Sequence, residues 1–263
     1  MTRARLEVCV DTHEGLEIAA AHGADRIELC TCLSAGGLTP SLSMMEAASR
    51  LACPTRVMIR PRDGDFTYSH GEVDMMLRDI DTVAALSLEG VVLGANHAAG
   101  HLDEMALGRL AGHAKRQGLK VTLHRSFDLA PNLVTALAIA RDLGIDAVLS
   151  SGGEMDAPSG VKTLKALVAA SKTAGNRIEV MAGVGVGSKT VREIVARTGI
   201  AWVHGSCSLP REIVSQEALR LGYSSPDHRR TDPEEISRTL EILADIDAGQ
   251  SAQSQARRGA ARG

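Results

Sequence analysis

Acidic and thiol side chains lie within short apolar runs that have the composition of β-strands. Glu7 and Cys9 lie in LEVCV, and Glu28 and Cys30 lie in DRIELC. Because burying an unpaired charge is costly, carboxylates in such runs need either ion-pair partners or a polar site to face. Two carboxylates near a guanidinium and an imidazole can divide the roles of acid, base and anion holder. These runs are therefore the first candidates for chemistry.

Later runs of the chain repeat the pattern. Side chains alternate between the two faces of a strand, so residues two apart in each run are expected to share one face. The expected inward set is Glu7, Cys9, Glu28, Cys30, Met58, Arg60, Arg62, Thr122, His124, His204 and Ser206, with Asp128 just after the fifth run. Two interpretations are open: ion pairs of Glu7 or Glu28 with Arg60 that close an interior layer, or a polar pocket for a ligand.

The pocket interpretation assigns catalytic and binding roles. Its catalytic candidates are Glu28, Arg60, His124 and Asp128, and its candidates for contacts to an anionic substrate are Arg62, His204 and Ser206. Glu28 or His124 would transfer the proton, and Arg60 would hold the anion. The inward set contains no Lys, so a Schiff-base aldolase is not indicated. This reasoning narrows the reaction to a lyase or isomerase type.

A glycine-rich turn adds a second anion-binding signal. MAGVGVGS (181–188) runs from an expected strand through Gly183, Gly185 and Gly187 to Ser188, which we expect to cap the next helix. Free N–H groups at such a turn and helix start favour phosphate or carboxylate. Glycine also permits positive φ in any tight turn, so a purely conformational role is the alternative.

The thiols indicate a soft metal. Cys30 and Cys32 form a C-x-C pair, and Cys9 lies on the neighbouring expected strand. Thiolates suit Cu(I), which accepts few ligands. Zinc is less favoured, because no second C-x-x-C or H-x₃-H completes a set of four ligands. The chain has five cysteines and starts without a signal-peptide apolar region, which predicts a cytoplasmic protein.

Eight β-rich runs alternate with segments of helical periodicity, and their starts are about 20 to 34 residues apart. Strict alternation favours a parallel sheet. Eight such units predict a single-domain (β/α)₈ TIM barrel, and no G-x-G-x-x-G follows the first run to favour a dinucleotide-binding fold. In this fold functional residues collect at the C-terminal ends of the strands.

An extra helix is expected near 233–246, opened by Asp232 and Pro233. The barrel domain would then comprise residues 1–248. Residues 249–263 contain no large apolar side chain, so a disordered tail is expected there.

Composition excludes several classes of protein. Hydrophobic residues make up 44% and charged residues 23% of the 263, and the net charge is −3. No window approaches ~20 unbroken apolar residues, so a membrane span is not expected. Near-neutral charge gives no indication of nucleic-acid binding. Aromatic residues make up only 2%, which predicts an aliphatic core.

At this point the motifs resemble those of the CutC copper-homeostasis family. The matching segments are spread over about residues 5–210 in family order: LEVC (6–9), GADRIELC (23–30), GGLTPS (36–41), IRPRDGDFTYS (59–69), HRSFD (124–128), SGG (151–153), MAGVGV (181–186) and HGSCS (204–208). The sequence departs from the family pattern at Asp63, where a Gly is usual.

The resemblance implies a cytosolic TIM barrel that acts in copper homeostasis and binds copper through cysteines at the barrel opening. Carried onto this chain, those cysteines are Cys9 and Cys30, with Cys32 just outside the second motif. The resemblance also implies a homo-oligomer, for which a dimer is the default. The alternative function is an enzyme for a small anionic or phosphorylated substrate that uses Glu28, Arg60 and His124.

Overall fold

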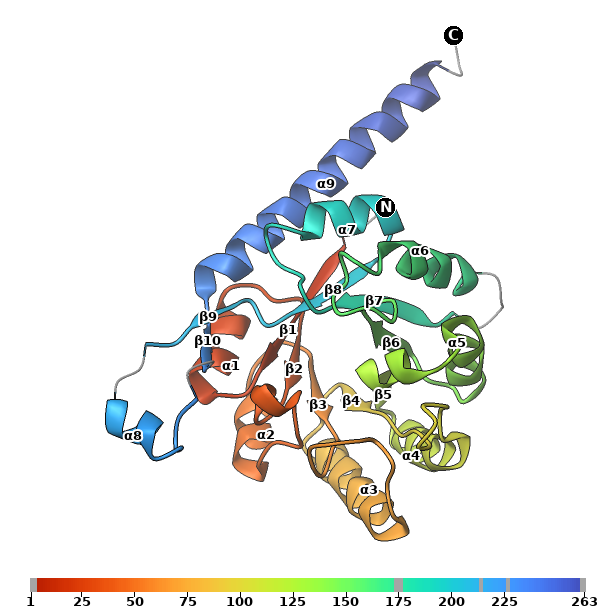
Figure 1. The fold of residues 1–263 in the computed structure, drawn as a ribbon. Helices are drawn as coiled ribbons and strands as arrows, with labels where there is room; N and C mark the ends of the chain where they lie inside the picture. The colour runs from red at the N-terminus through yellow and green to blue at the C-terminus, as the bar shows by residue number, and fades with distance from the viewer. Residues whose placement is uncertain (1–3, 173–176, 213–214, 226–227, 261–263) are drawn as a thin grey trace.

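Eight parallel strands form a closed barrel in the computed structural model, which describes residues 4–172, 177–212, 215–225 and 228–260, from residue 250 on by the backbone alone. The strands pair in chain order, and the first also pairs with the last (Figure 1). They are β1 (Arg5–Val10), β2 (Arg26–Leu29), β3 (Thr55–Met58), β4 (Gly90–Leu93), β5 (Lys120–Leu123), β6 (Ala147–Ser150), β7 (Glu179–Gly183) and β8 (Trp202–Gly205). This confirms the predicted TIM barrel.

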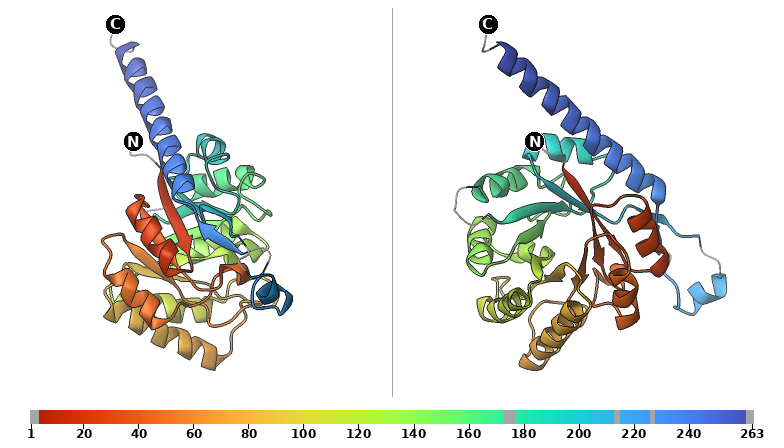
Figure 2. Two further views of the ribbon diagram at one scale, coloured as in Figure 1. Left: turned by 90° about the vertical axis from the view of Figure 1, so that its left-hand side faces the viewer. Right: turned by 180° about the vertical axis from the view of Figure 1, so that it is seen from behind.

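Helices follow the strands and surround the barrel (Figure 2). They are α1 (His13–Ala21), α2 (Leu42–Ser49), α3 (His70–Ala85), α4 (Glu104–Arg116), α5 (Leu133–Asp142), α6 (Val161–Ala170) and α7 (Val191–Thr198), with short 3₁₀ helices η1 (Leu33–Ala35) and η2 (Arg125–Leu129) after β2 and β5. Local capping fixes their starts; at α3, Ser69 and Glu72 form a reciprocal capping box. Among the described helices, none has the length and apolar composition that crossing a membrane requires.

The main aliphatic core lies between the barrel and its helices, whereas the lumen contains charged and polar side chains together with two small apolar clusters. On β1, Leu6, Val8 and Val10 belong to the outer core, and the alternate residues Glu7 and Cys9 face inward. The predicted alternation of the first strand is therefore confirmed. Two small apolar clusters lie on the inward strand faces: Cys30, Met58 and Val92, and Leu149, Met181 and Trp202.

A two-stranded sheet and two helices follow the barrel. β9 (Ser208–Pro210) pairs antiparallel with β10 (Arg229–Thr231), and α8 (Gln216–Arg220) lies between them in sequence. The chain then enters α9 (Pro233–Ala260). The Oδ2 of Asp232 accepts the N–H of Glu235 at 3.1 Å, which confirms the predicted start of this helix.

α9 continues beyond its predicted end near Ile246. Ile236 and Leu243 pack against the body, and the last turns project away from it as far as Ala260 (Figure 1). The physical reason is propensity: the segment after Gly249 is rich in Ala, Gln and Arg, which favour a helix without any apolar face to bury. Residues 261–263 of the expected tail lie outside the described residues, and the domain division at residue 248 stays a prediction.

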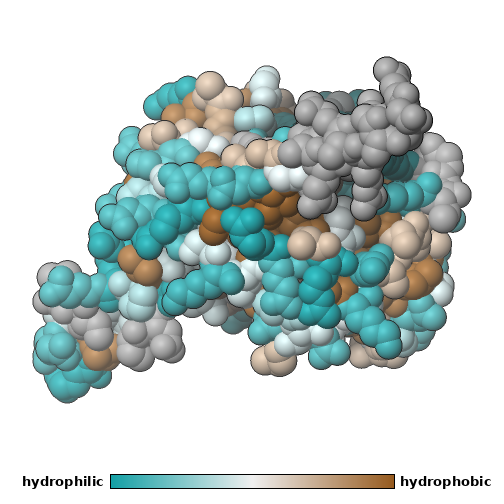
Figure 3. All heavy atoms as spheres, turned by 90° about the horizontal axis from the view of Figure 1, so that it is seen from above, coloured by the Kyte–Doolittle hydropathy of each residue, from teal (hydrophilic) through white to brown (hydrophobic). Residues whose placement is uncertain are grey.

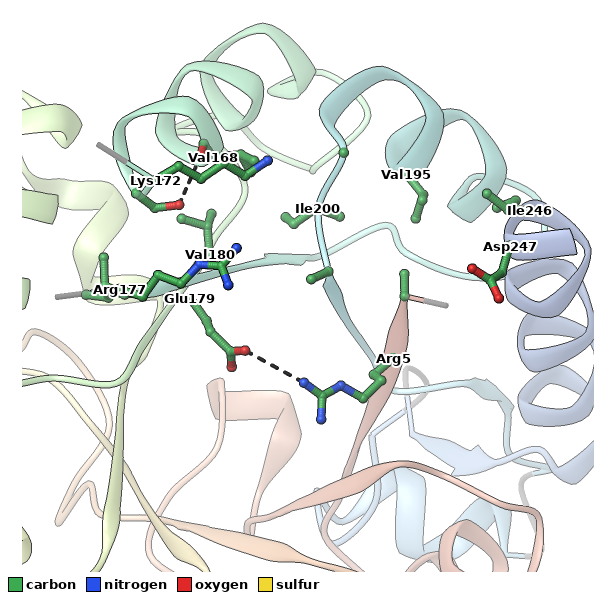
Figure 4. A pocket seen from close by; sticks show the side chains of 15 residues that line it. Arg5, Val168, Lys172, Arg177, Glu179, Val180, Val195, Ile200, Ile246 and Asp247 are labelled. Atoms are coloured by element: carbon green, nitrogen blue, oxygen red, sulfur yellow. Dashed lines mark hydrogen bonds and ion pairs between the residues drawn. The ribbon is translucent and has the colours of Figure 1, made fainter. Parts of the chain in front are cut away.

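A cavity of about 610 Å³ lies at the N-terminal ends of β1 and β7 (Figure 4). Arg5 and Glu179 form an ion pair of 3.8 Å on its wall, and Val195, Ile200 and Ile246 supply apolar lining. The face with α6, α7 and α9 is mostly hydrophilic, with an apolar strip (Figure 3). Because function in this fold gathers at the C-terminal strand ends, residues at this N-terminal end serve stability.

Candidate functional site

Three buried side chains of different types meet at the C-terminal ends of β1, β2 and β8. Ligand atoms of Cys9, Glu28 and His204 all lie within 4.8 Å of one another. Strand register brings them together, because Cys9 lies beside Glu28 and the β1 residue Glu7 lies beside His204. A thiol, a carboxylate and an imidazole at this spacing can hold a metal ion or exchange protons.

Glu7 orients the imidazole of His204. Its Oε1 lies 2.8 Å from Nδ1 of His204, and its Oε2 accepts a hydrogen bond from Nε of Arg26. The Nε2 of His204 consequently faces the other two members of this trio (Cys9, Glu28 and His204) and lies 3.8 Å from Oε2 of Glu28. A carboxylate behind the distal ring nitrogen is the usual support of a metal-binding histidine.

The electrostatics of the trio follow from its neighbours. Burial alone would raise the pKa of Glu7, but Arg26 and His204 lower it to about 2. Burial opposes protonation of His204, yet Cys9, Glu28 and Glu7 together raise its pKa well above the usual value. Burial and the nearby charge of Glu7 raise the pKa of Glu28, although His204 opposes this shift. Glu28 therefore holds a proton more readily than an exposed carboxyl.

The three predicted metal-binding cysteines do not lie in equivalent places. Cys30 is fully buried, and its Sγ lies 3.5 Å from Oε2 of Glu28; burial, reinforced by Glu28, raises its pKa well above the usual value. Cys32 is exposed and adopts a left-handed conformation with φ of 53°. Cys9 and Cys32 both line a cavity of about 370 Å³ at the mouth, and β10 covers it with Arg229 and Arg230.

Arg60 and His124 occupy the other side of the lumen, at β3 and β5. Nη1 of Arg60 donates to the carbonyls of Ala35 and Gly37, and Nη2 donates to that of Gly64. The expected ion pair of Glu7 or Glu28 with Arg60 is wrong, since Glu7 pairs with Arg26 instead. Arg26 stands two residues before Glu28, so strand register brings it beside Glu7, whereas Arg60 lies two residues beyond the end of β3.

His124 differs from His204 in every contact. Its Nδ1 accepts the N–H of Ser126 at 3.1 Å, which leaves the proton of the neutral ring on Nε2. Burial, together with the charge of Arg60, lowers its pKa to about 3. The Phe66 ring lies between the two, 4.8 Å from the imidazole centroid and 4.9 Å from the guanidinium carbon.

Two other predicted site residues tie loops together. Asp128 accepts hydrogen bonds from Ser150 Oγ at 2.5 Å and Ser151 N at 2.8 Å, and it pairs with Arg125. Arg62 pairs with Glu72 at the start of α3 and with the nearby Asp65. The structure therefore does not bring Asp128 or Arg62 to Glu28.

The glycine-rich turn already holds a carboxylate of the chain itself. Ser188 donates its N–H to Oε1 of Glu235 at 2.7 Å and its hydroxyl to Oε2 at 2.9 Å. The expected cap is wrong: Thr190, not Ser188, precedes α7, because a further turn separates Ser188 from the helix. Gly185 has φ of 69°, as a tight turn requires. Binding of an external anion by Gly183, Gly185, Gly187 and Ser188 stays a prediction.

The remaining predicted contact, Ser206, lines the mouth cavity, and its Oγ lies 2.7 Å from that of Ser208. Sequence reasoning missed two arginines, Arg26 and Arg56, whose ion pairs lie in the lumen below the trio. Arg26 pairs with Glu7 and stacks on Trp202 at 3.8 Å, while Arg56 pairs with Glu89 and donates to Thr122. The sequence did contain a signal: Arg26 and Arg56 each stand two positions before a residue predicted to face inward, so both should share that inward face.

Comparison with known proteins agrees with this architecture. The CutC family model matches residues 4–209. The family protein CutC of Sinorhizobium medicae is 48% identical over 236 residues, covering 90% of this chain and 94% of that protein. Its counterpart in Caulobacter vibrioides is 42% identical over 243 residues, covering 92% and 97%.

A solved structure extends the comparison to the fold. The crystal structure described as the "Putative Copper Homeostasis Protein CutC" of Streptococcus agalactiae superposes with a TM-score of 0.72 at 31% identity, covering 77% of this chain and 98% of that one. Since the family match spans most of the chain and includes β1 to β8 with the trio, this protein belongs to the CutC family.

Proposed function

We propose that this protein acts in copper homeostasis and binds Cu(I) through Cys9 and His204, with Cys30 as a further thiol ligand. The observation that carries the proposal is the buried trio, whose ligand atoms lie within 4.8 Å of one another. The name of the Streptococcus agalactiae relative supports copper as the metal. Cytoplasmic localisation and a homo-oligomeric state are part of the same proposal.

The donor set fits a soft monovalent ion. Cu(I) takes few ligands and prefers thiolates and imidazoles, which Cys9, Cys30 and His204 supply. The thiols must lose their protons on binding, and so must the imidazole of His204, whose pKa is raised. Glu28 accepts a hydrogen bond from Cys30, so its carboxylate is placed to take up such a proton. Glu7 would keep the imidazole of His204 aimed at the ion.

An entry path leads from solvent to Cys9. The cavity of about 370 Å³ at the mouth is lined by Cys9 below and by the exposed Cys32 at its edge. Arg229 and Arg230 outweigh the one acidic residue of the lining, Asp11, which favours an anionic complex of the metal over the bare ion. Cys32 would therefore contact the arriving complex first, and Cys9 would retain the metal.

A competition titration with Cu(I) under reducing conditions tests the proposal. The variants are Cys9→Ser, Cys30→Ser and Cys32→Ser, with Cys53→Ser as matched control, because Cys53 donates to the carbonyl of Ala24 away from the mouth. We expect stoichiometric binding that collapses in Cys9→Ser, weakens in Cys30→Ser and is unchanged in Cys53→Ser. Binding that tolerates every change, or a preference for Zn²⁺ over Cu(I), would overturn it.

A second candidate function is an enzyme of lyase or isomerase type for a small anion. It is favoured by three of the buried polar atoms that have no hydrogen-bond partner among the described residues: Glu28 Oε1, Arg60 Nε and His124 Nε2. Such atoms are costly unless a ligand or water completes them. Thermal stabilisation by the ligand should disappear in Arg60→Ala and Glu28→Gln; stabilisation that survives both changes argues against this function.

A further inference from the structure

The lumen beside Phe66 contains a buried cation without a counter-charge. Arg60 is 5% exposed, and its hydrogen bonds go to three backbone carbonyls, so no carboxylate of the described residues neutralises it. Burial raises the pKa of the nearby Tyr68, although Arg60 opposes this shift, so the Tyr68 hydroxyl supplies no negative charge. A buried guanidinium normally has a carboxylate or another anion beside it. An anion from outside the chain would supply that charge.

Two N–H donors are unsatisfied in the same place. The Nε of Arg60 and the Nε2 of His124 are buried and have no partner among the described residues. Both groups contact the Phe66 ring, at 4.9 Å and 4.8 Å. The N–H of Ser126 fixes the imidazole with its proton on Nε2, so this nitrogen acts as a donor and cannot act as a base.

The backbone just after β4 allows this arrangement. A Cβ at position 94 would lie 2.3 Å from both Cε1 of His124 and Oγ of Ser126, so only glycine lets the imidazole lie against Gly94. The hydroxyl of Ser126 is also buried, and no described residue is its hydrogen-bond partner. The half-buried Phe66, in the irregular segment between β3 and α3, packs against both the imidazole and the guanidinium.

We infer that Arg60 and the neutral His124 form a binding site for the carboxylate group of a small organic monoanion, which enters where Phe66 now lies. Two N–H donors match the two oxygens of a carboxylate, and one negative charge balances the single guanidinium. His124 serves as an electrophilic donor, as a neutral imidazole can in proton-transfer enzymes. The inference rests on the second candidate function and names its substrate class and the role of His124.

Binding of carboxylates to the chelator-treated protein tests this site without copper. The probes are acetate, glycolate and pyruvate, with inorganic phosphate for comparison, and the readout is the ¹⁵N and ¹H shift of the His124 Nε2–H. We expect carboxylates to shift this resonance while phosphate does not. No shift with any carboxylate, or a shift with phosphate alone, would overturn the assignment.

Two variants separate the two roles of His124, the proposed hydrogen bond from Nε2 to the ligand and the hydrogen bond that Nδ1 accepts from the N–H of Ser126. His124→Asn retains an oxygen for the N–H of Ser126 but loses the donor at the ε position, whereas His124→Gln retains a donor there and loses the cap. Affinity for the carboxylate should fall about tenfold or more in His124→Asn, the loss of one hydrogen bond to a charged group, and less in His124→Gln. Equal affinity in His124→Asn and wild type would place binding elsewhere.

The outcomes keep the proposals distinct. Carboxylate binding without turnover would leave the site intact and remove the enzymatic function. Turnover without any response of the His124 resonance would support the enzymatic function and remove the carboxylate site. Because Cys9 and His204 are unchanged in the His124 variants, Cu(I) affinity should stay at the wild-type value in both.

Discussion

His204 and His124 stand at comparable inward positions near the ends of β8 and β5, both are buried, and their pKa values move in opposite directions. The pKa of His204 is raised well above its usual value, and that of His124 is lowered to about 3. Burial disfavours the charged form of each, so neighbouring charges decide the outcome. Glu7, Glu28 and Cys9 surround His204, whereas Arg60 faces His124. One lumen thus contains an acidic half around His204, where we propose metal binding, and a cationic half around His124, where we propose carboxylate binding.

The acidic half should respond most strongly to loss of Glu7. Glu7→Gln removes the close carboxylate partner of the buried Arg26 and leaves it only the longer contact to Oε2 of Glu89, at 4.0 Å, which should cost about 3–5 kcal/mol of unfolding free energy. It also removes the carboxylate behind His204, so the pKa of His204 should fall and metal affinity should drop about 10–100-fold. Chemical denaturation, NMR titration and metal competition measure the three effects. Glu89→Gln is the control, because Glu89 is partly exposed; an equal loss there would contradict the special role of Glu7.

The two histidines should give the stability opposite dependences on pH. For His124, the unfolded chain takes up a proton near the usual pKa of 6.5 while the folded protein does not until about pH 3. Its contribution is therefore complete above pH 6.5 and is lost as the pH falls, by about 2 kcal/mol at pH 5. For His204 the contribution is complete below pH 6.5 and is lost as the pH rises through its raised folded value.

Unfolding free energies of wild type and His124→Asn across this pH range isolate the first effect. The difference between the two proteins should shrink as the pH falls from 8 to 5. A difference that does not change with pH would show that His124 titrates normally in the folded protein. The imidazole of His204, followed by NMR in wild type, should remain protonated well above pH 6.5.

Asp128 tests whether the loop beside His124 is structural. Asp128→Asn weakens its hydrogen bonds to Ser150 and Ser151 and its ion pair with Arg125, so we expect a loss of about 1–3 kcal/mol of stability. Carboxylate affinity at Arg60 and His124 should change little. Denaturant unfolding measures the stability, and the NMR titration with carboxylates measures the affinity. A loss of ligand affinity without a loss of stability would support the predicted catalytic role of Asp128.

The smallest effect is expected at the turn after β7, which lies in neither half. Glu235→Ala frees the N–H and hydroxyl of Ser188, and we expect a loss of about 1 kcal/mol. The freed turn should then bind inorganic phosphate more tightly than wild type does. Isothermal titration calorimetry with phosphate checks this, and unchanged affinity would count against an anion site at the glycines.

The fold was predictable because it depends on periodicity. Alternation of strands with helices predicted the barrel, and the two-residue period predicted that Glu7, Cys9 and Glu28 face inward. The end of α9 was not predictable in the same way. Its last turns lie away from the barrel, so their helical state follows from propensity rather than from an apolar pattern.

Residue types along the sequence thus determined the barrel, its polar lumen and the presence of thiols, carboxylates and imidazoles at the mouth. Only the tertiary structure decided which of these residues are partners. Register placed Arg26 rather than Arg60 beside Glu7, brought Cys9, Glu28 and His204 together, and left Arg60 with His124. The reason is physical: a side chain's face depends on its own strand, whereas its charge partners and its pKa depend on strands distant in sequence.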